Sequence, residues 1–295
     1  MQITDTLSYI WRHPANRGRR GTALARAIGW QIFKRASGRP WDISIAGNIK
    51  LRCHPDSTSA SAALYCNGRP DYHEMGFMLD YLKPGDRFVD IGANVGVYAL
   101  LAASVVGEHG AVDAYEPDAR AAARLRENVR LNGLKTVTIR QAAVSAHDGT
   151  VTFSMDQDTT NRILGKEHTA CATTTVSCSR LDTLYPDGDL AMVKMDIEVA
   201  EPLALSGGAG LLARSDPKVW LLELNGLLHN FGYTEKGLAD WLGERGYDLG
   251  LYDADMHELR IGGEPWKMRD NVLAISRRHR DEVMNRCGAT LVLLG

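Results

Sequence analysis

Three carboxylates follow one apolar stretch of the sequence. In "VKMDIEVAE", residues 193–201, Asp196, Glu198 and Glu201 come directly after residues typical of a buried strand. Burying a carboxylate costs free energy unless a partner or a ligand compensates its charge, whereas a helix dipole favours negative charge in the first turn. We predict that Asp196 is a site residue, that Glu198 fits either role, and that Glu201 is a helix-start charge. Lys194 lies two residues before Asp196 and could pair with an acid.

A second apolar stretch ends in a similar way. "WLLELN", residues 220–225, closes with Glu223 and Asn225, and His229 follows four residues later. Glu223 inside an apolar strand needs a partner. The ordinary pKa of histidine suits a general base, although a histidine on a loop is also a common surface group. Glu223 and His229 therefore join Asp196 and Glu198 as candidate catalytic residues.

A glycine-containing loop earlier in the chain has the composition of a ligand-binding turn. "DIGANVG" contains Asp90, Gly92, Asn94 and Gly96. Glycine lets the backbone turn sharply and approach a ligand, and the N-terminus of the helix that follows supplies free N–H groups. The spacing departs from the dinucleotide pattern GxGxxG. It suits the amino-acid end of a smaller adenosyl ligand, with Asp90 near the ammonium group.

Two later strand ends complete this candidate cofactor site. Glu116 comes twenty residues after Gly96, and an acid at that position accepts hydrogen bonds from ribose hydroxyls. The next strand ends at Gln141 and Ala142, where small residues leave room for an adenine ring and an amide can bind its edge. A plain strand end explains Gln141 and Ala142 equally simply. The combination of the glycine loop with Glu116 predicts a bound adenosyl nucleoside. Asp196 is expected to emerge beside this ligand and to contribute to its site.

The elements that position these residues alternate along the chain. Short apolar runs at 87–92, 111–117, 137–144, 191–197, 219–225 and 271–277 alternate with helical patterns, which predicts parallel βαβ units in a doubly wound, Rossmann-like α/β fold. We assign this domain to residues 84–295. Residues 1–83 are predicted to form an α/β cap with a helix at 22–36, a β-hairpin at 41–53 and a helix at 71–82. Residues 145–179 have the pattern of an inserted β-hairpin.

Composition limits the partners and the compartment. The 295 residues carry a net charge of -2, which gives no global argument for a nucleic-acid partner. Residues 12–39 are locally basic, so they form either a solvated helix face or a contact with phosphates or an anionic membrane. Five cysteines without a CxxC pair fit reduced thiols. We expect a cytoplasmic protein that touches the inner membrane face at most peripherally.

Three motifs in the same order resemble the FkbM family of S-adenosylmethionine-dependent methyltransferases. They are "FVDIGANVGVYALLA", "YEPDARAAARLRENVRLNG" and "VKMDIEVAEPLALSGG", and the similarity extends over about residues 72–277. The resemblance implies a class I methyltransferase fold with a mostly parallel, seven-stranded sheet whose last strand is antiparallel. It implies S-adenosylmethionine as cofactor and methyl transfer to oxygen, on a sugar, glycan or glycolipid, or on a polyketide or other secondary-metabolite alcohol.

The resemblance also suggests roles for the acidic residues, with one departure. Asp196 is our first candidate to accept or orient the acceptor hydroxyl, His229 is the second, and Glu223 supports them. The family usually has Asp-Val-Glu-Gly after the fourth strand, whereas this chain has Val199 in place of the glycine. The turn into the next helix, and the acceptor pocket with it, could therefore differ.

The sequence bears on three other functions. A nucleic-acid amino-methyltransferase typically has Asp/Asn-Pro-Pro-aromatic after the fourth strand, and this chain has Asp-Ile-Glu-Val. A nicotinamide dehydrogenase would have GxGxxG in place of the loop at Gly92. A catalytically silent adenosyl-binding protein stays open because of Val199. The oxygen ligands Asp196, Glu223 and Asn225 could hold Mg²⁺, but their spacing is not specific for a metal, so no metal site is predicted.

Overall fold

The computed structural model describes residues 3–154, 173–198, 200–226, 228 and 232–294. His229 and Val199 lie outside these described residues. No helix in the described part is both long enough and apolar enough to cross a membrane.

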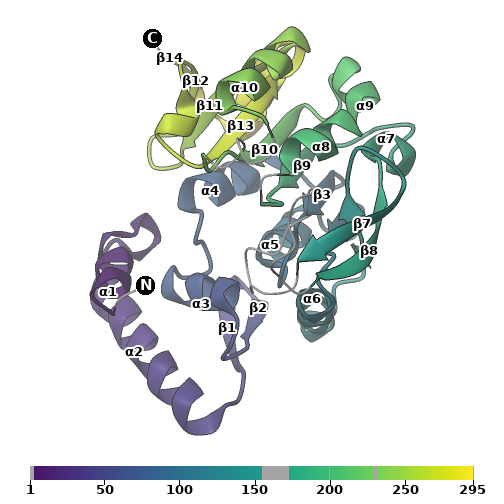
Figure 1. Cartoon of the computed structure of the whole chain (residues 1–295). Coiled ribbons are helices and arrows are strands. Elements are labelled where there is room, and N and C mark those ends of the chain that lie inside the picture. Colours follow the sequence, from purple (N-terminus) through teal and green to yellow (C-terminus); the bar gives the residue numbers. More distant parts are fainter. Residues whose placement is uncertain (1–2, 155–172, 199, 227, 229–231, 295) are drawn as a thin grey trace.

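The centre of the described structure is one large sheet (Figure 1). Its nine strands, in spatial order, are β14 (Thr290–Leu294), β12 (Glu258–Gly262), β11 (Tyr247–Asp253), β13 (Asn271–Ser276), β10 (Val219–Glu223), β9 (Met192–Met195), β3 (Arg87–Ile91), β4 (Ala111–Tyr115) and β5 (Val137–Arg140). Strands β5, β4, β3, β9 and β10 are parallel neighbours, and β13 runs antiparallel between β10 and β11. The predicted Rossmann-like α/β fold is confirmed.

Two details differ from the sequence predictions. The sheet has nine strands rather than seven, because β12 pairs antiparallel with β11 and β14 pairs with β12, which extends the edge. The apolar run 137–144 is not one strand. It divides into β5 and β6 (Ala143–Val144), and β6 belongs to a separate sheet with β8 (Thr173–Ser179) and β7 (Gly149–Ser154). These last two strands are the antiparallel hairpin predicted for residues 145–179.

Helices cover both faces of the large sheet because successive strand residues point to opposite sides. On β10, Val219 and Leu221 join one hydrophobic cluster, whereas Trp220 and Leu222 join the other. The first cluster includes residues of α4 (Tyr72–Tyr81), α5 (Val97–Val106), α6 (Ala119–Leu131) and α11 (Arg280–Cys287). The second includes residues of α7 (Leu181–Leu184), α8 (Glu201–Ser206), α9 (Ala209–Ala213) and α10 (Glu235–Glu244).

The N-terminal part packs on the first of these clusters. It consists of α1 (Ile3–Arg12), α2 (Arg20–Ser37), the hairpin of β1 (Trp41–Ala46) and β2 (Ile49–Cys53), and α3 (Thr58–Tyr65). Trp30 and Leu51 belong to the same cluster as Leu100 of α5. Figure 1 shows α1 and α2 at the edge of the molecule, away from the large sheet. The division at residues 83 and 84 stays a prediction.

Candidate active site

One pocket lies at the carboxyl ends of β3, β4, β9 and β10, where ligands bind in open parallel sheets. Its volume is about 240 Å³. Eight of the residues singled out from the sequence line it, namely Gly92, Asn94, Glu116, Ala142, Lys194, Asp196, Glu198 and Glu223. The topology thus brings together side chains that lie more than 100 residues apart in the sequence.

Glu116 is a fixed, buried carboxylate in the pocket wall. Its Oε2 accepts a hydrogen bond from the backbone N–H of Asn94, and its Oε1 accepts one from that of Asp118, each at 2.8 Å. Burial raises the pKa of Glu116 to about 7, although the two backbone hydrogen bonds oppose the shift. A carboxylate has about four lone-pair positions, so two acceptor positions are left for hydroxyl groups of a ligand.

Gly92 lets two backbone segments meet at the pocket floor. Its φ is +75°, and a Cβ there would lie 1.9 Å from the backbone oxygen of Asp196. The backbone N–H groups of Gly92 and Ala93 both donate to the oxygen of Tyr115. Glycine is therefore required at this position both by backbone conformation and by the close approach of the loop after β9.

Lys194 is a buried cation in the floor of the pocket. Its Nζ lies 3.2 Å from Oδ2 of Asp196 and 3.5 Å from Oδ1 of Asp90, and it donates to the backbone oxygen of Gly92 at 3.0 Å. Burial alone would lower the pKa of Lys194, but attraction to Asp196 and Asp90 outweighs it and raises that pKa. The lysine is therefore charged and compensates two carboxylates.

Asp90, Gly96 and Gln141 do not line this pocket. Asp90 is completely buried opposite Lys194 on the neighbouring strand, and burial raises its pKa. Gly96, with φ of +94°, is the residue before α5. Gln141 is exposed, with its Oε1 3.5 Å from a guanidinium nitrogen of Arg126. The cofactor roles assigned to these three residues stay predictions.

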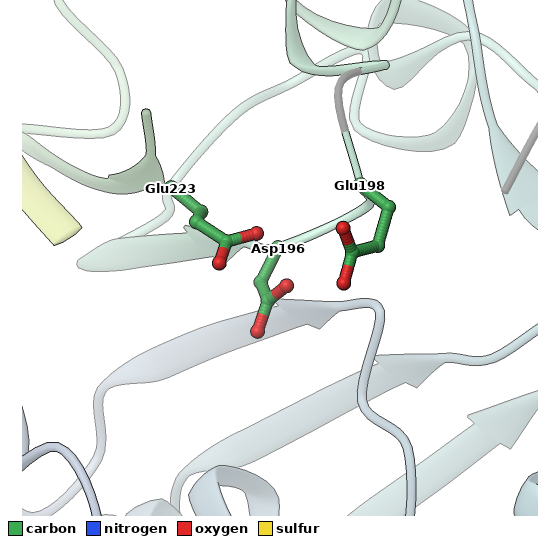
Figure 2. A group of neighbouring side chains, drawn as sticks. All are labelled: Asp196, Glu198 and Glu223. Carbon is green, nitrogen blue, oxygen red and sulfur yellow. The ribbon is translucent and has the colours of Figure 1, made fainter. Parts of the chain in front are cut away.

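Asp196, Glu198 and Glu223 form an acidic cluster. Figure 2 shows the three side chains converging from the loop after β9 and the end of β10. Each offers a carboxylate oxygen within 4.8 Å of the others. Burial and the charge of Asp196 raise the pKa of Glu223 well above its ordinary value, and the two side chains share a hydrogen bond. Glu223 is therefore the protonated partner, and it donates to the Asp196 carboxylate.

The turn that carries this cluster is held by a fourth acid. Glu201, the first residue of α8, is completely buried, and its Oε1 accepts a hydrogen bond from the backbone N–H of Ile197 at 3.0 Å. Burial raises the pKa of Glu201 to about 8. Glu198 has a φ of +50°, which is uncommon for a residue with a side chain. Glu201 thus does more than start a helix, because it fixes the turn between Asp196 and Glu198.

Asp71 and Tyr98 also line the pocket and were missed by the sequence analysis. Asp71 is the N-cap residue of α4, yet its side chain makes no capping hydrogen bond. It hydrogen-bonds to the Tyr98 hydroxyl, and burial and the nearby Asp196 raise its pKa. From the sequence, an aspartate before a helix is explained by capping, so no signal distinguished it.

The strand order, with the pocket at the carboxyl ends of the parallel strands, is that of a class I methyltransferase fold. The family model described as the methyltransferase FkbM domain matches residues 90–249, more than half of the chain. The chain therefore belongs to the FkbM methyltransferase family, as its three motifs suggested.

Individual known proteins resemble this chain only over part of its length or at low sequence identity. The ribosomal protein L11 methyltransferase of Thermotoga neapolitana is 34% identical over 73 residues, which are 25% of this chain and 27% of that protein. An FkbM methyltransferase from Methylobacillus flagellatus has a crystal structure with a TM-score of 0.45 and 14% identity, over 86% of this chain and 60% of that one. A putative rRNA methylase from Clostridium thermocellum gives a TM-score of 0.41 at 11% identity, over 68% and 90% of the two chains.

Proposed function

We propose that this protein transfers a methyl group from S-adenosylmethionine to a hydroxyl of a sugar, glycan or glycolipid. The observation that carries the proposal is the position of Asp196. Its side chain is 41% exposed, it lines the pocket, and it is supported from below by Lys194. A carboxylate that is both accessible and charge-compensated can receive a hydrogen bond from an acceptor alcohol.

The pocket residues fit the cofactor. Glu116 presents free acceptor positions for the ribose hydroxyls, and the backbone at Gly92 and Asn94 borders the space for the amino-acid end. Ala142 supplies a small side chain where a flat base can lie. Bound S-adenosylmethionine supplies an electrophilic methyl group on a sulfonium.

Asp196 would orient the acceptor hydroxyl and take up its proton as the oxygen is methylated. Lys194 lies 3.2 Å from Asp196, and the hydrogen bond from Glu223 fixes the direction of the carboxylate. Holding the acceptor oxygen in line with the methyl group supplies much of the rate enhancement in such a displacement. Proton acceptance by a positioned carboxylate contributes about 10²–10⁴-fold more.

Several acidic groups favour a polyhydroxyl acceptor. Asp71, Asp196, Glu198 and Glu223 line the same pocket, and carboxylates and carboxylic acids can each bind hydroxyl groups. A sugar presents several hydroxyls that these groups could bind, whereas a phosphate-rich nucleic acid would meet repulsion. A polyketide alcohol has fewer hydroxyls to match these groups.

The test begins with calorimetric titration of the purified protein with S-adenosylmethionine. We expect Glu116→Ala to abolish binding and Glu108→Ala, an exposed glutamate away from the pocket, to leave it unchanged. Sugar nucleotides, glycolipids and polyketide alcohols are then assayed for methyl transfer. Asp196→Asn should lower kcat by about 10²–10⁴-fold and leave cofactor binding intact.

The results separate the alternatives. Methylation of polyketide alcohols alone would replace the sugar acceptor. Cofactor binding without transfer to any acceptor class would indicate a silent S-adenosylmethionine-binding protein. Failure of the wild type to bind the cofactor would refute the enzyme proposal.

A further inference from the structure

Exposed apolar side chains are concentrated in the N-terminal helices. Of the twelve large hydrophobic side chains that are exposed in the described part of the chain, seven lie within residues 7–41. These seven are Leu7, Tyr9, Trp11, Ile28, Ile32, Phe33 and Trp41. A contiguous set of exposed apolar residues marks an interaction surface, whereas scattered single residues do not.

The face of helix α2 opposite to its packed residues exposes apolar side chains. Its buried residues are Ala23, Ala27 and Trp30. Ile28 and Ile32, which are 53% and 63% exposed, lie one turn apart on the outer face. Arg35 follows at the next turn and is exposed as well. The outer face of α2 therefore combines branched apolar side chains with a cation.

The N-terminal segment that carries this face is strongly basic. Residues 1–41 contain eight basic residues and one acid, Asp5, although the whole chain has a net charge of -2. Arg20 lies over the Trp11 ring at 5.4 Å, which places that tryptophan beside the start of α2. Trp41 contacts Phe33 near the end of α2, with ring centroids 5.5 Å apart. Aromatic residues thus lie at both ends of a basic helix.

We propose that the outer face of α1 and α2 binds the surface of an anionic lipid bilayer. Interfacial helices combine Trp, Phe and aliphatic residues with Lys and Arg, and each basic residue near an anionic membrane contributes favourably. The same charge disfavours a second copy of this chain as the occupant, because self-association would bring two basic faces together.

Helix α3 lies between the N-terminal helices and the active site. A second cavity is lined by residues of α1, α2 and α3, among them Tyr9, Lys34 and Ala62. Ala62 also lines the pocket that holds Asp196. The membrane proposal does not depend on the acceptor proposed above.

The test is co-sedimentation of the full chain with vesicles at low salt. Vesicles of phosphatidylglycerol and phosphatidylcholine are compared with vesicles of phosphatidylcholine alone. Ile32→Glu and Arg35→Gln probe the surface. Met256→Glu, at a side chain 62% exposed, and Arg278→Gln are the matched controls elsewhere on the molecule.

We expect binding to anionic vesicles only, weakened about fivefold by Arg35→Gln and at least as much by Ile32→Glu. The controls should bind like the wild type, and all variants should retain the S-adenosylmethionine affinity of the wild type, which shows that they are folded. Absence of wild-type sedimentation would overturn the proposal. So would equal losses in the control variants, or a dimer in solution that Ile32→Glu dissociates.

Discussion

Lys194 and Asp90 are register partners on the adjacent parallel strands β9 and β3, and Lys194 Nζ lies 3.5 Å from Oδ1 of Asp90. The same ammonium lies 3.2 Å from Asp196. One buried cation therefore joins a completely buried acid to an acid that faces the pocket. Its loss would leave Asp90 uncompensated in the core and Asp196 unsupported in the pocket.

The first prediction concerns this lysine. Lys194→Met should lower the free energy of unfolding by about 3 kcal/mol, because removal of one partner leaves a buried charge unpaired. The double variant Lys194→Met/Asp90→Asn should recover part of that loss. Lys218→Met, which breaks a more exposed pair with Glu282, should cost less than about 1 kcal/mol. Urea unfolding of the four proteins measures the difference, and equal losses at both lysines would contradict the interpretation.

The second prediction concerns the close approach at Gly92. Gly92→Ala combines a positive φ with a Cβ 1.9 Å from the Asp196 oxygen, so we expect a loss of about 3 kcal/mol or more. Gly246→Ala has a similar φ of +84° and no atom within 4 Å of its Cβ. It should cost only about 1 kcal/mol. Thermal unfolding compares the two variants, and an equally small effect at both sites would show that the loop can move apart.

Much of this arrangement could be predicted from the sequence because it follows from periodicity. Apolar runs that alternate with helices specify parallel strands, and the carboxyl ends of such strands meet at one edge. That reasoning placed Glu116, Asp196 and Glu223 in one pocket, where the structure also has them. The pairing of Lys194 with an acid was anticipated for the same reason, because residues two apart on a strand share a face.

Other features depend on tertiary packing that the sequence does not mark. Asp71 reaches the pocket from the N-terminal part. In the sequence, helix capping alone explains an aspartate at its position. The run at 137–144 contains no proline or glycine. The sequence therefore does not mark Gln141 as the place where the chain leaves the large sheet. The two extra edge strands, β12 and β14, pair at the far end of the sheet. None of the sequence motifs of the site includes them.

The third prediction concerns the pH dependence that Glu223 produces. The ordinary pKa of a glutamate is 4.5, so Glu223 loses its proton above that pH in the unfolded chain. In the folded protein the raised pKa lets Glu223 keep this proton. Stability contributed by this group should therefore decrease as pH rises from about 4.5 through neutral pH. Ionisation of Glu223 beside Asp196 should also reduce activity at alkaline pH.

Glu223→Gln keeps a neutral donor and should therefore remove both effects. We expect kcat at neutral pH within about fivefold of the wild type, because no ionised group is lost. The alkaline decline of activity should disappear, and the unfolding free energy should depend less on pH. A pH–rate profile and unfolding curves at several pH values test this prediction. An unchanged profile in the variant would assign the titration to another acid.

The fourth prediction concerns metal dependence. Asp196, Glu198 and Glu223 offer oxygens close enough to bind a divalent cation, but the charge of Asp196 is already balanced by Lys194 at 3.2 Å, and Glu223 holds a proton. Since Mg²⁺ requires several well-placed, unprotonated oxygens, we expect methyl transfer to be unaffected by millimolar EDTA and by added Mg²⁺. Glu198→Gln would serve as the second measurement, because loss of a metal ligand would make activity depend on higher Mg²⁺ concentration. Inhibition by EDTA that Mg²⁺ reverses, together with that shift in Glu198→Gln, would show that the acidic cluster holds a cation and that Lys194 alone does not compensate it.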